Sequence, residues 1–142
     1  TGGAQQSLDM TLAYITGRQQ FGRSIASFQA IKHRCADLML AVECARSASY
    51  YAACIADACL NIDADPQVRG QLAEAAATAK IHASEGFFQC ASESIQLHGG
   101  VGFTWEYDPH LYFKRARASE QLWGAPAFHR EQLARQIFGE QA

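Results

Sequence analysis

The chain has little charge, few prolines and no paired cysteines, and each scarcity excludes a class of protein. Charged residues make up 18% of its 142 residues and the formal net charge is −2, so no surface for nucleic acid or anionic membrane is expected. Three prolines beside 49% apolar residues indicate a folded chain, not a disordered tail. No apolar run approaches the roughly 18 residues of a membrane helix, and no signal peptide is recognisable.

The cysteines show neither disulfide nor metal spacing. Their odd number, without a Cys-x-x-Cys pair, predicts reduced thiols in a cytoplasmic protein and no bound metal. We expect them to pack as small buried apolar side chains. They are Cys35, Cys44, Cys54, Cys59 and Cys90.

Apolar residues recur in steps of three and four, which predicts helices throughout and no strand. The length suits one domain over residues 1–142, although its opening inside a structured segment suggests a piece of a longer protein. In the first predicted helix, Leu8, Leu12 and Ile15 form the inner stripe. Asp9 and Thr11 lie outside that stripe, and Gly17 ends the helix.

A second helix, about 50 Å long, follows a predicted turn over residues 18–22. Ser27 is expected to cap this helix, and a polar break over residues 61–66 ends it. Its predicted inner stripe consists of Phe28, Ile31, Cys35, Leu38, Val42, Ala45, Ala48, Ala52, Ile55, Cys59 and Ile62.

A third long helix begins at Pro66, with Asp65 as its cap. It continues to about Leu97, and the glycines from Gly99 onward stop it. Its predicted inner stripe consists of Val68, Leu72, Ala76, Ala79, Ala83, Phe87, Ala91 and Ile95.

Shorter elements complete the chain. Residues 103–108 are predicted to be irregular, residues 109–119 a short helix and residues 123–126 a loop. A last helix over residues 127–138 turns Phe128, Leu133 and Ile137 inward. The predicted fold is therefore an all-α antiparallel four-helix bundle, with two very long central helices and shorter flanking ones. Alanines all round the long helices favour contacts with further subunits.

Three stretches, in order, resemble motifs of the acyl-CoA dehydrogenase family. They are RQQFGRSI at 18–25 followed by FQAIKH at 28–33 and ADL at 36–38, then AKIHASE at 79–85, then QLHGGVGFTWEY at 96–107. The resemblance covers nearly the whole chain and implies the carboxy-terminal helical bundle of that family. The family's amino-terminal helical domain and middle β-domain are absent from this sequence.

The resemblance implies FAD as cofactor, bound where the bundle of one subunit covers a flavin held mainly by its neighbour. Arg18 would contact the pyrophosphate, and Gln29 would lie near the adenine and ribose. The remaining cofactor contacts would be Phe21, Gln96, Leu97, Gly99 and Gly100. A planar guanidinium suits a pyrophosphate, and glycines without Cβ atoms let backbone approach a ligand. Taken singly, these residues could equally be a solvated arginine, a surface glutamine and a helix cap.

The family reaction is α,β-desaturation of an acyl-CoA thioester, in which a glutamate removes the α-proton. Trp123 stands where many members carry that glutamate, and Glu120 lies three residues too early. A second subgroup places the glutamate just before a Gly-Gly pair like Gly2-Gly3, which here lies upstream of Thr1. No catalytic base can be assigned in this chain, and the isolated chain is predicted to be inactive.

Three functions stay open. The chain is part of an enzyme with an upstream glutamate, a non-catalytic subunit completing a partner's FAD site, or a purely structural bundle. Arg115 and the loop at Trp123 resemble divergent subunits of heteromeric bacterial dehydrogenases, including those acting on sterol side-chain thioesters. The resemblance implies an acyl-CoA substrate, a homo- or heterotetramer and an electron-transfer flavoprotein as acceptor. His98, Trp105 and Tyr107 are interpreted as packing residues.

Overall fold

The computed structural model describes residues 1–60 and 65–139 as a helical bundle. Five α-helices, two 3-10 helices and one minimal hairpin make up these residues. In chain order they are α1 (Gly2–Gly17), β1 (Gln19–Gln20), β2 (Arg23–Ser24), η1 (Ile25–Ser27), α2 (Gln29–Cys59), α3 (Pro66–His98), η2 (Gly99–Phe103), α4 (Pro109–Gln121) and α5 (Pro126–Phe138).

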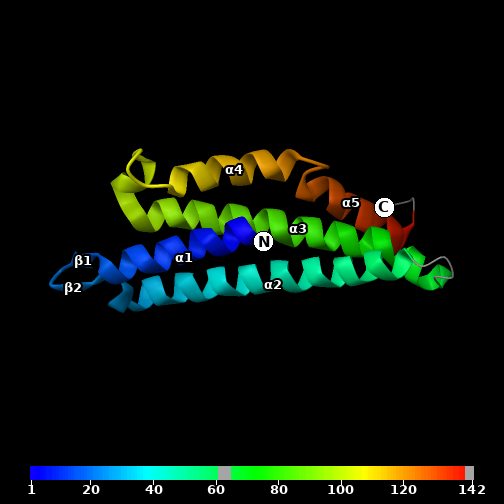
Figure 1. The fold of residues 1–142 in the computed structure, drawn as a ribbon, viewed down its shortest axis with the longest axis horizontal. Coiled ribbons are helices and arrows are strands. Elements are labelled where there is room, and N and C mark those ends of the chain that lie inside the picture. Colours follow the sequence, from blue (N-terminus) through cyan, green and yellow to red (C-terminus); the bar gives the residue numbers. More distant parts are fainter. Residues whose placement is uncertain (61–64, 140–142) are drawn as a thin grey trace.

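Helix α3 lies at the centre of the bundle. Figure 1 shows α2 along one side of α3 and α4 along the other, and α1, α2, α4 and α5 all contact α3. α1 and α3 run in one direction while α2 and α4 run in the other, which confirms the predicted antiparallel bundle. α2 leaves a side uncovered, where Leu40 and Tyr50 are exposed.

The core forms where α1, α2 and α3 meet. Its fully buried cluster consists of Ala4, Leu8, Leu38, Val42 and Cys90, with Phe87 packed against it. Gly86 brings α2 and α3 close together, because a Cβ there would lie 3.2 Å from the carbonyl oxygen of Ala41. Burying side chains such as Leu8 and Leu38 stabilises the fold by about 1.5–3 kcal/mol each.

The ends of α3 match the prediction. The Asp65 carboxylate accepts a hydrogen bond of 2.8 Å from the backbone N–H of Gln67, and Pro66 occupies the first turn. Gly99 ends the helix with φ 67°, in the left-handed region. The polar break at residues 61–64 and the stripe position Ile62 lie outside the described residues.

The start of α2 differs from the prediction. Ser27 is not its cap: Phe28 holds the cap position without a side-chain bond, and the Ser27 hydroxyl donates to the Ser24 carbonyl at 2.7 Å. The expectation of no strand was also wrong. Gln19–Gln20 pairs antiparallel with Arg23–Ser24 around the turn at Phe21 and Gly22. Two-residue strands are too short for period-two alternation to reveal them.

Several burial predictions were wrong. Thr11 is fully buried, because its hydroxyl donates to the Ser7 carbonyl at 2.7 Å, whereas Leu12 is 39% exposed. In α5, Phe128 and Ile137 are exposed, since only one side of that helix meets α3. Among the cysteines only Cys90 is buried. Cys44 and Cys54 are exposed, while Cys35 and Cys59 are half-buried.

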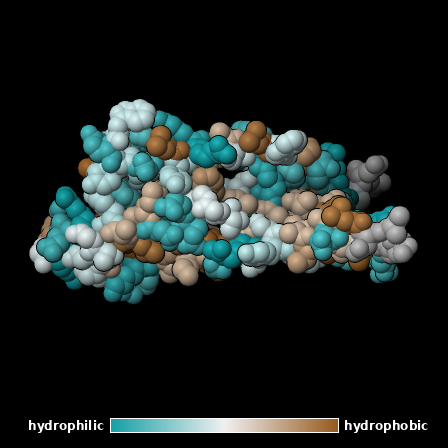
Figure 2. All heavy atoms as spheres, in the orientation of Figure 1, coloured by the Kyte–Doolittle hydropathy of each residue, from teal (hydrophilic) through white to brown (hydrophobic). Residues whose placement is uncertain are grey.

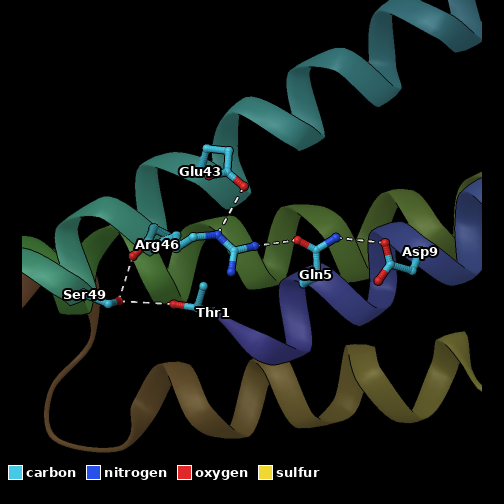
Figure 3. Close-up of polar contacts among 7 residues, drawn as sticks. Thr1, Gln5, Asp9, Glu43, Arg46 and Ser49 are labelled. Atoms are coloured by element: carbon cyan, nitrogen blue, oxygen red, sulfur yellow. Dashed lines mark hydrogen bonds and ion pairs between the residues drawn. The ribbon is translucent and has the colours of Figure 1, made fainter.

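A polar seam joins the start of α1 to α2 (Figure 3). Arg46 donates to Gln5 at 2.7 Å and to Glu43 at 3.2 Å. The Thr1 and Ser49 hydroxyls lie 3.2 Å apart. These contacts fix the first turn of α1 against α2 and hold Thr1 near the middle of the bundle.

Within the described parts of the chain, no helix is both long and apolar enough to cross a membrane. The same residues contain no group of three or more His, Cys, Asp or Glu side chains that could hold a metal ion.

Candidate functional site

Five of the predicted cofactor residues meet at one end of the bundle. Arg18 comes from the end of α1, and Gln96, Leu97, Gly99 and Gly100 come from the end of α3. They line a hollow of about 500 Å³, here called the corner hollow. Its complete lining is Tyr14, Arg18, Gln20, Ile25, Gln96, Leu97, His98, Gly99, Gly100 and Val101.

The short hairpin folds back onto α1 and so places Arg18 at this hollow. The Ser24 hydroxyl contacts the carbonyl oxygens of Ile15 at 2.9 Å and Thr16 at 3.0 Å, the last turn of the helix. These carbonyls lack partners inside α1, and the hydroxyl can donate its single proton to one of them at a time. Arg18 itself is extended, with φ −77° and ψ 125°, and leaves the helix towards the hollow.

The corner hollow fits an anionic, hydrogen-bonding ligand such as a pyrophosphate. Among the described residues, no hydrogen bond or ion pair engages the Arg18 guanidinium, which is exposed. A Cβ on Gly99 or Gly100 would meet no protein atom within 4 Å, so it would occupy space open to a ligand. A permanent positive charge thus lies beside backbone that a ligand can approach closely.

His98 packs against Tyr14 at the corner hollow. Its ring stacks on Tyr14, with centroids 4.2 Å apart and an interplanar angle of 23°. Nδ1 donates to the Ser94 carbonyl at 2.6 Å, which places the ring proton on that nitrogen. Burial lowers the pKa of His98, although the Ser94 contact opposes this shift. His98 therefore packs and hydrogen-bonds as predicted, in its neutral form.

Phe21 and Gln29 do not line the corner hollow. Phe21 lies at the tip of the hairpin, 91% exposed, with its ring edge-on to Phe28 at 6.2 Å. Gln29, in the first turn of α2, lies 2.9 Å from the His33 ring nitrogen and is exposed. Both side chains face solvent within this chain, and their cofactor contacts stay predictions.

A second hollow, of about 600 Å³, lies against the middle of α3 and is here called the side hollow. It opens between α4 and the start of α1, where Figure 2 shows the surface dipping. Its lining is mostly apolar, and sequence reasoning did not foresee it. The lining residues are Thr1, Gly3, Lys80, Ala83, Ser84, Phe87, Leu111, Tyr112, Arg115, Ser119, Leu122 and Trp123.

The loop between α4 and α5 forms one edge of the side hollow. Trp123 has φ 63° and Gly124 φ 96°, so an L-residue with a large side chain adopts the left-handed conformation. The Trp123 indole is 90% exposed. His129 Nε2 donates to the Trp123 carbonyl at 2.9 Å and thereby holds the turn.

Two charged side chains of α3, Lys80 and Glu85, contact the helices on either side of this loop, α4 and α5. The Lys80 ammonium donates to Ser84 Oγ at 2.8 Å and to the carbonyls of Ser119 and Glu120 at 3.0 and 3.1 Å. A cation at a helix carboxyl end is favourable, because the carbonyls there lack helical partners. Burial lowers the pKa of Lys80, partly offset by the Glu120 carboxylate.

The second contact joins α3 to α5. Arg130 donates to both carboxylate oxygens of Glu85, at 2.5 and 2.6 Å. Hydrogen bonding by Arg130 is the main reason that the pKa of Glu85 lies below its ordinary value. In the sequence, Lys80 and Glu85 were singled out only as members of the AKIHASE motif, which did not predict their contacts with α4 and α5.

Among the described residues, no carboxylate lines the side hollow. Glu120 does not line it, and its carboxylate is paired with Arg117 at 2.7 Å. Trp123 lines one edge, and Thr1 and Gly3 line another. Trp123, at one of the positions where the resemblance places the glutamate, thus borders the same hollow as Thr1, the first residue after the other position.

Comparison with known proteins places the chain among flavoenzymes. Residues 1–138 match the family described as acyl-CoA dehydrogenase, C-terminal domain. Acyl-CoA dehydrogenase IpdE2 of Mycobacterium tuberculosis is 46% identical over 125 residues, which cover 88% of this chain and 35% of that protein. The chain thus spans about a third of the length of this curated relative.

Solved structures share the fold. The ChsE4–ChsE5 complex from Mycobacterium tuberculosis contains a chain of 28% identity with a TM-score of 0.84, over 99% of this chain and 36% of that one. A variant of the Tcur3481–Tcur3483 steroid ACAD is 30% identical with a TM-score of 0.83, over 96% and 35%. The predicted all-α bundle is confirmed by these similarities.

Proposed function

The chain belongs to the acyl-CoA dehydrogenase family, and on that premise we propose that it is the helical domain, residues 1–142, with which a flavin-dependent dehydrogenase covers FAD and assembles. The whole protein would catalyse α,β-desaturation of an acyl-CoA thioester. When bound, FAD supplies the acceptor for the hydride that leaves the β-carbon.

The corner hollow is the observation that carries this proposal. Arg18 would bind the pyrophosphate with its planar fork of donors, and Gln96, Leu97, Gly99 and Gly100 would lie along the diphosphate and ribose. Phe21 and Gln29 would extend the contact towards the adenine, since both side chains are exposed to solvent in this chain. Because Arg18, Phe21, Gln29 and Gln96 are exposed, the flavin would be held mainly by another part of the protein or by another subunit.

The side hollow suits the reacting end of the substrate. The apolar part of its lining would partly desolvate a carboxylate and raise its pKa, while Lys80 and Arg115 would oppose that shift. Trp123 cannot abstract a proton, so the glutamate must come from residues outside this chain. The glutamate would arrive either just upstream of Thr1 or on a different subunit.

A non-catalytic role has specific support. The tryptophan at the edge of the side hollow, together with Arg115, favours a subunit that completes the FAD site of a different catalytic chain. ChsE4–ChsE5 is named as a complex of two chains, which offers a precedent for such an assembly. We propose a tetramer of like or unlike subunits, with the uncovered side of α2 as one contact.

The remaining assignments concern the substrate and its surroundings. The steroid ACAD among the structural relatives favours a sterol-derived acyl-CoA. The five cysteines are all free thiols, as in a reducing compartment such as the cytoplasm. An electron-transfer flavoprotein would then receive the electrons, as the family resemblance implies.

Arg18→Ala in the complete assembly tests the cofactor assignment. It should weaken FAD binding by on the order of 1.5–3 kcal/mol, because a charge-assisted contact is lost. Flavin occupancy after dialysis, followed by absorbance, measures the loss. Lys32→Ala removes another exposed positive charge from the same end of the bundle and should leave occupancy unchanged. Equal occupancy in wild type and Arg18→Ala would contradict the pyrophosphate contact.

A further inference from the structure

We propose that Trp123 forms a side wall of the acyl site and selects broad, ring-bearing acyl groups over slender ones, with Lys80 and Glu85 as its positioning residues. This inference rests on the proposed function, since it assigns the side hollow to the acyl part of the thioester.

The first support is the conformation of the turn. The left-handed backbone conformation is unfavourable for a non-glycine residue. Trp123 adopts it with its indole exposed, so packing within this chain does not compensate the strain. Strain of this kind concentrates where a side chain must be presented to a ligand. Among the described residues, Phe21 is the other non-glycine with positive φ, and it lies at the predicted cofactor surface.

The second support is that α3 fixes both sides of the turn. Lys80 holds carbonyls in the last turn of α4, and Glu85 holds the second turn of α5 through Arg130. Lys80 and Ser84 also line the side hollow, so the hollow and the turn share one support. Movement of the turn backbone relative to the hollow therefore requires that one of these contacts break.

The third support is the shape and chemistry of the hollow. About 600 Å³ lies within the 300–1,000 Å³ that sites for drug-sized ligands occupy, and a short alkyl chain would leave most of it unfilled. The Phe87 ring packs directly on Gly3, because a Cβ on Gly3 would lie 2.5 Å from this ring. The base of the side hollow, here called its floor, is therefore broad and aromatic. A flat ring system can contact this floor and the indole at once, whereas a slender chain contacts only one of them.

Binding of unreactive thioesters tests the selection. α,α-Dimethylbutanoyl-CoA and α,α-dimethyl-cyclohexylpropanoyl-CoA have no α-proton, so their dissociation constants can be measured on the complete flavin-loaded protein by calorimetry. Trp123→Ala should weaken the ring-bearing thioester by about tenfold or more and the butanoyl thioester by less than about threefold. Trp123→Phe should restore most of the selectivity, because an aromatic wall remains.

Trp105→Ala serves as the matched control. It truncates the chain's second tryptophan, which is 80% exposed and does not line the side hollow. It should leave both dissociation constants unchanged. An equal loss for both thioesters in Trp123→Ala, or no loss for either, would overturn the proposal.

The positioning role has its own readout. Glu85→Gln should lower affinity for the ring-bearing thioester selectively, and it should add nothing in a Trp123→Ala background, because both changes act through the same wall. Arg135→Gln breaks a pair within α5, between Arg135 and Glu131, and should have no effect. Additive losses in the double variant would refute positioning through Trp123.

Flavin content separates the two proposals. A wild-type assembly that binds no FAD would refute the proposed function, and the acyl-wall proposal, which rests on it, would fall with it. Bound FAD with no effect of Trp123→Ala would refute only the acyl-wall proposal.

Discussion

Two tight turns at different places in the bundle share an unusual backbone. Phe21–Gly22 and Trp123–Gly124 each place an aromatic residue with positive φ before a glycine with positive φ. Both aromatic side chains are about nine-tenths exposed. The turns differ in the contacts that stabilise them. Residues close in sequence hold the first turn, and residues from other helices hold the second.

The Phe21 turn is stabilised by its near neighbours in the sequence. Antiparallel pairing of residues 19–20 with 23–24 closes it, and the Arg23 guanidinium lies 3.9 Å from the centroid of the Phe28 ring. The Trp123 turn has no strand. It depends on His129 from α5 and on Lys80 and Glu85 from the distant helix α3. The first turn can therefore form with its hairpin, whereas the second needs the packed bundle.

The largest expected contrast comes from alanine at the two glycines. Gly124→Ala should destabilise the chain by about 2–4 kcal/mol, because it adds left-handed strain and a Cβ that would lie 2.8 Å from the Phe128 ring. Gly22→Ala meets no atom within 4 Å and should cost only the strain, about 1–2 kcal/mol. Urea unfolding of both variants measures this. Equal losses would show that crowding at Phe128 is relieved without cost.

Lowering the pH should reduce the stability of the fold by an amount between the largest and smallest effects. The pKa of Glu85 is below its ordinary 4.5 in the folded chain, so its contact stabilises the fold above that value. Stability is lost as the pH falls through the lowered pKa. Fluorescence of Trp123, followed in a Trp105→Phe background from neutral pH to about pH 3, should change there. In Glu85→Gln this transition should be absent, and its persistence would assign it to another group.

The smallest effect should come from asparagine at the two aromatic positions. Asparagine tolerates left-handed backbone better than aromatic residues do. Trp123→Asn should stabilise the chain by about 0.5–1 kcal/mol, since the exposed indole makes few contacts. Phe21→Asn should be close to neutral, because it also loses the ring contact with Phe28. Thermal unfolding compares the two, and a destabilised Trp123→Asn would reveal packing of the indole within this chain.

Much of the bundle could be predicted because its signals are local. Steps of three and four mark the helices, and Asp65, Pro66 and Gly99 mark the ends of α3 through hydrogen bonds and backbone preference. The resemblance assigned Arg18 and the end of α3 to one cofactor surface, and the structure brings these residues together at the corner hollow.

The remaining features depend on packing partners that periodicity does not reveal. Thr11 is buried and Leu12 is 39% exposed according to which sides of α1 meet α3 and α2. The left-handed Trp123 and the two donations of Lys80 to carbonyls of α4 depend on α3 meeting α4 and α5. Residues far apart in the chain set these features, so no local window could predict them.

The central place of α3 has a consequence for how the chain opens. Its middle carries buried Ile81, Gly86, Cys90 and Ala91, and every other α-helix rests on it. Amide protons there can exchange with solvent only when the whole bundle unfolds. Amides of α5, which touches α3 on one side, should exchange through local fraying. Exchange rates along α3 therefore report the global free energy of unfolding. Those along α5 report the local stability that the contact between Glu85 and Arg130 gives to this helix.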